Sequence, residues 1–129
     1  DPEQRPAARA RILLAGSERT PPQLGRWYVT SAGNVLDQVE PGQLASSAGL
    51  SQLIYACLRV AREFPVDSIR RQLEKWLRSA PPLAENAALA LRAINPDWER
   101  EAVETAISDS ETPELTRTFL AGHLRRLDP

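Results

Sequence analysis

The only side chains in this chain that pair a nucleophile with a general base are Cys57 and His123. Their separation is twice a 33-residue interval that recurs elsewhere in the sequence. If helices pack about 8–10 Å apart, two such steps separate the pair by roughly 20 Å, whereas a catalytic dyad needs about 3 Å. Cys57 also falls on an apolar stripe, where cysteine is usually a small buried residue. We therefore predict no catalytic residue and no enzymatic activity.

Metal and cofactor chemistry is equally poorly supported. One histidine and one cysteine exclude the common zinc sites, and a single cysteine excludes an internal disulfide. No glycine-rich phosphate loop, calcium-loop spacing or other chemical motif is present. The acidic residues cluster near the C-terminus, and we interpret them as a solvated helix face, two of them (Glu99 and Glu101) also favouring a helix dipole. The cluster comprises Asp97, Glu99, Glu101, Glu104, Asp109, Glu111 and Glu114.

The basic residues offer an alternative function. Arg59, Arg92 and Arg125 recur at the same 33-residue interval and would form a row along successive helices, able to follow a nucleic-acid backbone or an acidic peptide. A further basic group gathers across one predicted hairpin: Arg59, Arg62, Arg70, Arg71, Lys75 and Arg78. Positive charge near a helix C-terminus is favoured for helical reasons alone, and the net charge of −1 provides no overall attraction to polyanions. Nucleic acid is thus the alternative partner, not the first.

A weakly charged stretch is the more informative anomaly. From Trp27 to Leu58 only Asp37 and Glu40 carry charge. Either this segment is a central helix buried on several sides, or it is a surface that a partner covers. Protein interfaces are depleted of Lys and Glu and enriched in aromatic residues. The candidate partner-binding residues are Trp27, Tyr28, Tyr55 and Trp76, although Trp76 also fits a partly buried lid over a hairpin joint.

Helical periodicity and proline placement predict an all-α fold. Eleven prolines fall almost entirely between periodic segments, where they end one helix or open the next. Thr20-Pro21, Asn95-Pro96 and Thr112-Pro113 each read as a helix cap followed by proline. A β-hairpin over 27–36 is a rival to a helix there, but five stripe positions favour the helix. The expected helices cover 3–15, 24–39, 50–61, 66–77, 83–94, 96–107 and 115–127.

One short pattern repeats with a 33-residue period. Leu58-Arg59-Val60-Ala61, Leu91-Arg92-Ala93-Ile94 and Leu124-Arg125-Arg126-Leu127 occupy that constant offset. Helical hairpins recurring at this interval are typical of solenoid proteins. The segment 86–94, followed by a Pro-Asp that opens the next helix, resembles the HEAT-like family of α-solenoids. What this resemblance implies is a curved stack of helical hairpins used as a docking surface, not a particular reaction.

Together these patterns predict a single helical-repeat domain over 1–129, with an irregular first repeat at 17–48 and regular repeats over 50–127. About seven helices would form stacked antiparallel hairpins, as a short HEAT-like solenoid or an irregular bundle. The expected function is a non-enzymatic protein–protein interaction module, an adaptor or scaffold, without cofactor. Because the chain opens at Asp1 and not at Met, we expect a processed or excised piece that works as one part of a larger chain or complex. No apolar run approaches a membrane span, and cytoplasm is the default compartment, with a periplasmic or secreted mature form left open. The partner's identity and the oligomeric state are not predicted.

Overall fold

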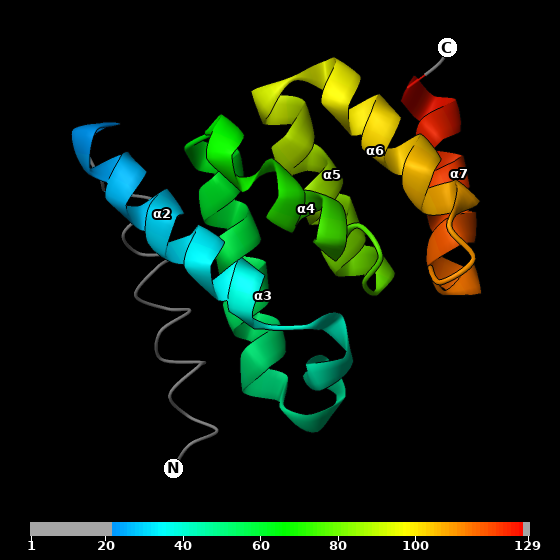
Figure 1. Cartoon of the computed structure of the whole chain (residues 1–129), viewed down its shortest axis with the longest axis horizontal. Helices are drawn as coiled ribbons and strands as arrows, with labels where there is room; N and C mark the ends of the chain where they lie inside the picture. The colour runs from blue at the N-terminus through cyan, green and yellow to red at the C-terminus, as the bar shows by residue number, and fades with distance from the viewer. Residues whose placement is uncertain (1–21, 128–129) are drawn as a thin grey trace.

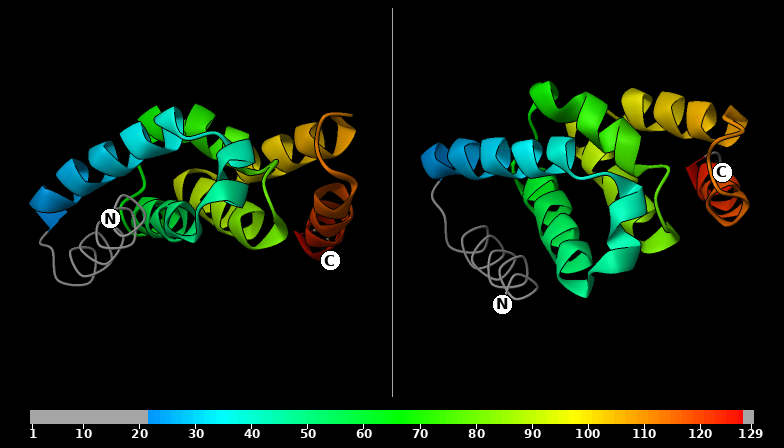
Figure 2. Two further views of the ribbon diagram at one scale, coloured as in Figure 1. Left: turned by 90° about the horizontal axis from the view of Figure 1, so that it is seen from below. Right: turned by 60° about the horizontal axis from the view of Figure 1, so that its bottom comes forward.

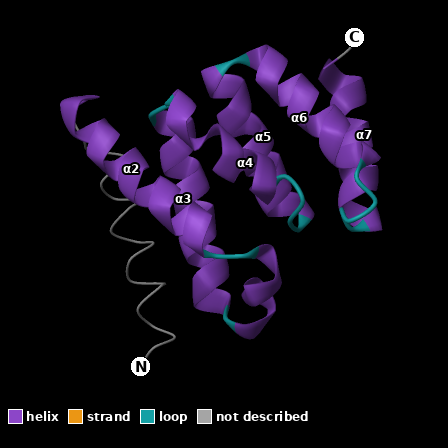
Figure 3. Cartoon of the chain, viewed as in Figure 1, coloured by secondary structure: helices purple, strands orange, loops and turns teal. Residues whose placement is uncertain are grey.

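The computed structural model describes residues 22–127, with side chains from residue 28 onward except that of Ser46. This part of the chain is helical throughout and contains no strand (Figures 1 and 3). It holds six α-helices and two short 3-10 helices. The expected helix at 3–15 and the Thr20-Pro21 cap lie outside the described residues. The preference for a helix over a hairpin at 27–36 is confirmed, because α2 runs through that segment.

The elements follow one another with short connections. In order they are α2 (Pro22–Gln38), η1 (Pro41–Ser46), α3 (Ala48–Glu63), η2 (Asp67–Ile69), α4 (Arg70–Trp76), α5 (Pro81–Ile94), α6 (Pro96–Ser108) and α7 (Glu114–Leu127). The helices α3, α5 and α7 begin at Ala48, Pro81 and Glu114, which keeps the 33-residue interval. Residues separated by that interval therefore occupy the same turn of each helix.

Local capping chemistry explains several of these boundaries. The Asn95 side chain accepts a hydrogen bond from the backbone N–H of Asp97, and Pro96 fills the first position of α6, as predicted. Ser47 caps α3 through the N–H of Leu50. Two expectations are wrong. Pro81 opens α5 instead of ending the preceding helix, and the buried Thr112 hydroxyl has no hydrogen-bond partner among the described residues, so it does not cap α7.

The helices form two layers. Figure 2 shows α2, α4 and α6 on one side and α3, α5 and α7 on the other, with α2 and α3 at one end and α7 at the opposite end. Each helix of one layer packs on its chain neighbour in the other, and α5 contacts both α3 and α7. Consecutive helices therefore lie in opposite layers.

The core lies between the layers and repeats with the same interval. Ile54, Ala87 and Leu120, at equivalent turns of α3, α5 and α7, all have no exposed surface. Leu58 and Leu91 are likewise fully buried, and Leu124 is partly buried against the core. At these two sets of positions, the equivalent residues of α3, α5 and α7 are all buried or partly buried in the core.

One close approach fixes how α2 crosses η2. A Cβ built on Gly33, in the middle of α2, would lie 2.7 Å from Cγ2 of Ile69. Glycine is a poor helix former, by about 1 kcal/mol relative to alanine, so its use here is explained by contact between the elements. None of the helices in the described part of the chain has both the length and the apolar character that a membrane crossing requires.

Candidate functional site

The nucleophile and the base considered above do not meet. Cys57 is fully buried in α3, and His123 is buried in α7, with α5 lying between these helices (Figure 1). Both residues occupy the same core-facing turn, as their spacing predicts. A histidine at such a position requires a polar partner, and the structure supplies one from α6.

That partner is Glu99, which is only 1% exposed and joins three helices. Its Oε1 accepts a hydrogen bond from Nε of Arg92 on α5 at 2.9 Å, and its Oε2 lies 2.9 Å from Nε2 of His123 on α7. Glu99 shares the inner face of α6 with Ala102, which places the carboxylate toward the core. Burying a carboxylate costs several kcal/mol unless it is paired and hydrogen-bonded, and here it is both.

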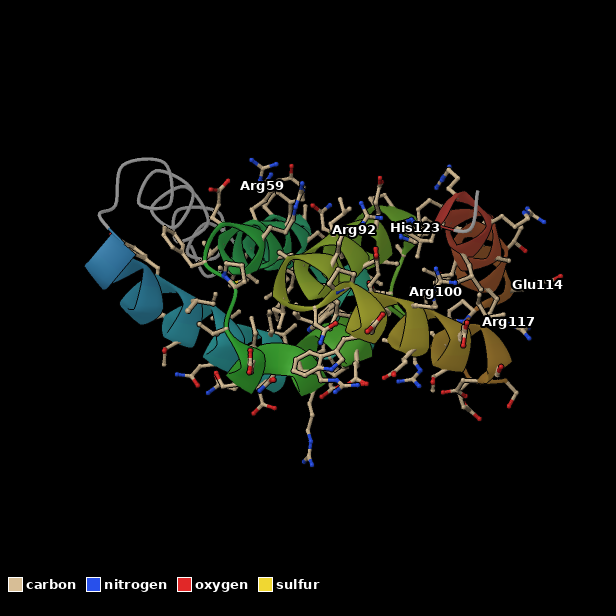
Figure 4. All side chains as sticks on the ribbon, turned by 90° about the horizontal axis from the view of Figure 1, so that it is seen from above. Arg59, Arg92, Arg100, Glu114, Arg117 and His123 are labelled. Carbon is tan, nitrogen blue, oxygen red and sulfur yellow. The ribbon has the colours of Figure 1, made fainter. Side chains whose placement is uncertain are left out.

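A cleft borders this network, between α5 and the C-terminal half of α7. We call it the α5–α7 cleft; its volume is about 380 Å³. Arg92 and His123, the two partners of Glu99, form part of its wall, and Figure 4 shows them next to one another between the two helices. The complete lining is Glu85, Leu89, Arg92, His123, Arg126 and Leu127.

The predicted arginine row is only partly available to a ligand. Arg59, Arg92 and Arg125 do lie on equivalent turns of α3, α5 and α7. Figure 4 shows the first two on successive helices of the same layer. Arg59 is half-buried, Arg125 is exposed, and Arg92 is held by Glu99. The three residues therefore differ in their surroundings although they share a register.

Most of the wider basic group holds helices together. Arg70 packs its guanidinium 4.2 Å from the ring of Trp98 and contacts Glu101 at 3.4 Å, linking α4 to α6. Lys75 of α4 donates to two backbone carbonyls at the C-terminal end of α2, each at 3.0 Å. Arg78 likewise pairs with Asp109 at 2.9 Å. These contacts give most of the group a structural role.

The aromatic residues predicted to contact a partner differ in solvent exposure. Tyr55 is 40% exposed on α3, whereas Tyr28 is partly buried against the core. The side chain of Trp27 lies outside the described residues. Trp76 is fully buried, and its Nε1–H donates to the carbonyl of Leu36 at 2.9 Å. A partner cannot reach it, so the prediction of Trp76 as a partner-binding residue is wrong.

Leu115, in the first turn of α7, is 71% exposed. It lies at the rim of a second, largely apolar hollow of about 390 Å³, built from the turns that precede η1, α5 and α7. Three prolines, Pro41, Pro81 and Pro113, contribute to this hollow. The next residue, Thr116, is buried and donates a hydrogen bond to the carbonyl of Ser79, so Leu115 lies on the opposite, outer side of this first turn.

Sequence reasoning also assigned Glu99 to the solvated acidic face, which is wrong for this residue. A usable signal was present, because Glu99, Ala102, Val103 and Ala106 fall on one helical stripe. His123 stands at the same spacing from Leu120 and Thr116. Across residues 22–127 no three potential ligands among His, Cys, Asp and Glu gather closely enough to hold a metal ion.

Comparison with known proteins does not assign the chain to a family. No family model matches the chain, and searches of curated proteins and of solved structures found no match either. The similarity to HEAT-like solenoids therefore remains a resemblance carried by the residues quoted above.

Proposed function

We propose that this chain is a non-enzymatic protein–protein interaction module, an adaptor or scaffold built as a short α-solenoid of about seven helices within a longer protein. Support for the solenoid comes from α3, α5 and α7, which begin at a constant interval and bury equivalent side chains. Stacked helical hairpins present extended faces that suit docking of a partner. The predicted 1–129 helical-repeat domain is part of this proposal.

The exposure of Tyr55 carries the proposal. By the 33-residue interval Tyr55 corresponds to Ala88 of α5, which is fully buried. Tyr55 thus occupies a turn that is covered in α5, yet it exposes 40% of its surface in α3, near one end of the helices that the structure describes. A large aromatic side chain exposed at a stacking position suits a contact with another protein.

The composition of the segment that leads to Tyr55 fits the same function. The exposed side chains of α2, η1 and the first half of α3 are mostly uncharged, in contrast to those of α6. They include Thr30, Asn34, Gln38, Gln43 and Gln52. Uncharged polar and aromatic surface costs less to desolvate than Lys or Glu, which explains the composition of protein interfaces.

Photo-crosslinking tests this proposal. A benzophenone amino acid replaces Tyr55 in one variant and Thr105, an exposed residue of α6, in the matched control. Both are exposed to ultraviolet light in lysate of the source organism. We expect a discrete adduct heavier than the 14.3-kDa chain from position 55 and none from position 105. Tyr55→Glu should prevent the same partner from being captured through a crosslinker on a neighbouring residue, while Thr105→Glu should not.

Three outcomes contradict the proposal. They are no adduct from position 55, a crosslink formed only within one copy of the chain, or equal amounts of adduct from both positions. Circular dichroism and thermal melting of each variant exclude unfolding as the cause. An adduct of twice the chain mass identifies the partner as a second copy.

A further inference from the structure

The α5–α7 cleft has the features of a built binding site. Its volume of about 380 Å³ lies in the range of small-ligand sites. One of its lining residues, His123, is only 5% exposed and is fixed through Nε2 by the buried Glu99. A buried carboxylate that holds wall residues in place pre-organises the cleft, which reduces the entropy lost on binding.

Arg92 supplies the main recognition group. Its Nε bonds to Glu99 and turns that edge of the guanidinium inward, while the side chain as a whole remains 43% exposed. That hydrogen bond uses Nε alone, which leaves the donors of the two terminal nitrogens outside it. Two such donors can bind a carboxylate through two parallel hydrogen bonds, a geometry that lysine cannot reproduce.

The charge around the cleft favours a single anion. Arg126 brings a second exposed cation from α7, whereas Glu85 lies two helical turns before Arg92, about 10 Å away along α5. Formally, Arg92 and Arg126 are balanced by Glu85 and Glu99. The cleft therefore has no net charge, and an anion binds there only through directed hydrogen bonds from Arg92 and Arg126. Two guanidinium groups suit one carboxylate, whereas a multiply charged phosphate chain gains nothing from its extra charge.

Apolar side chains complete the lining. Leu89 and Leu127 contribute to the walls from the same two helices as the arginines. A ligand that fits places an apolar group directly beside its carboxylate. The last residue of a polypeptide has this arrangement, because its carboxylate and its side chain share one Cα. An internal Asp or Glu presents its carboxylate on short methylenes without such a group.

We propose that the α5–α7 cleft binds the terminal carboxylate of a partner protein whose last residue is apolar. The proposal rests on the proposed function only in taking the ligand to be a protein. It uses a surface separate from Tyr55, so failure of either test leaves the other intact.

Amide NMR titration of the full chain tests the site directly. The probes are N-acetyl-alanyl-leucine with a free carboxylate, the same dipeptide as its amide, and N-acetyl-aspartic acid amide. We expect saturable shifts at His123 and Arg126 with the free acid. The amide should bind about 10–100-fold more weakly, which is the value of a charge-assisted hydrogen-bonded pair. The aspartic acid derivative should also bind at least about tenfold more weakly, because it lacks the apolar group.

Variants locate the binding groups. Arg126→Gln changes an exposed residue and should weaken binding of the free acid, while Arg71→Gln, an exposed arginine of α4, should leave it unchanged. Arg92→Lys keeps the charge but loses the fork and should weaken binding about tenfold, with folding checked by circular dichroism.

Absence of saturable shifts with the free acid overturns the proposal. So does equal affinity for the acid and the amide, equal affinity for the aspartic acid derivative, or insensitivity to Arg126→Gln. Displacement of the dipeptide by an equal concentration of a short DNA duplex overturns it in favour of polyanion binding.

Discussion

Removing the half-exposed Arg92 should destabilise the protein more than removing the buried Glu99. The two side chains form one ion pair, but their solvent exposure differs greatly, at 43% for Arg92 and 2% for Glu99. What each deletion leaves behind therefore decides its cost. Arg92→Met leaves a buried carboxylate whose remaining partner among the described residues is His123. Glu99→Met leaves an arginine that reaches water.

The expected magnitudes follow from that asymmetry. Leaving a buried charge unpaired costs about 3–5 kcal/mol, and we place Arg92→Met near the lower end because one hydrogen bond to the carboxylate remains. Glu99→Met leaves the buried Nε2 of His123 without its carboxylate partner, but it also removes the buried charge, so it should cost about 1–2 kcal/mol. The double variant lacks the buried carboxylate and should be more stable than Arg92→Met alone, by about 2 kcal/mol.

Urea unfolding followed by far-UV circular dichroism measures all three variants. Arg125→Met is the matched control, because Arg125 occupies the equivalent turn of α7 and is exposed. It should stay within about 0.5 kcal/mol of the parent chain. The reasoning is refuted if Glu99→Met costs as much as Arg92→Met, or if adding Glu99→Met to Arg92→Met restores no stability.

Three further predictions use the same unfolding assay. Gly33→Ala should destabilise the protein by about 1 kcal/mol, because overlap with Ile69 costs more than the gain in helix propensity. Gly122→Ala should stabilise it by about 0.5–1 kcal/mol, because the new Cβ meets only a guanidinium nitrogen at 3.7 Å. A change in stability of the same sign for both variants would contradict this explanation of Gly33. Thr112→Val should stabilise by about 1 kcal/mol, since it removes a buried hydroxyl that has no partner among the described residues, and a loss of stability would show that the hydroxyl is satisfied. Lys75→Met should destabilise the protein by about 1–2 kcal/mol, because it leaves two carbonyls at the end of α2 without their cation. An unchanged urea midpoint would show that these two hydrogen bonds do not stabilise the fold.

Features set by neighbouring residues were predictable from the sequence. The start of α6 follows from Asn95 and Pro96, which act within one turn of backbone. The common start interval of α3, α5 and α7 follows from the recurrence of similar side chains. The choice of helix over hairpin at 27–36 was also correct, because the apolar stripe has helical spacing.

Features set by contacts between helices could not be predicted from the sequence. Trp76 looks like a surface aromatic in its own segment, and only the carbonyl of Leu36, on a helix far earlier in the chain, explains its burial. The cleft depends on Arg92, Glu99 and His123 meeting across three helices. Glu99 and His123 were each visible on an apolar stripe, but no local pattern states that they face one another.

The charged side chains that do not pair with other helices indicate what kind of ligand the folded chain can bind. Arg62, Arg70, Lys75 and Arg78 hydrogen-bond or pair with side chains or carbonyls of other helices or turns, so they cannot follow a polyanion without breaking those links. Of the arginines left exposed on α7, Arg126 lines a cleft whose wall also includes Arg92, which is paired with Glu99. A polyanion site requires many cations in sequence along a surface, whereas this cleft is lined by two. The charge pattern that first suggested a row along successive helices therefore argues, in the folded chain, for recognition of a single carboxylate.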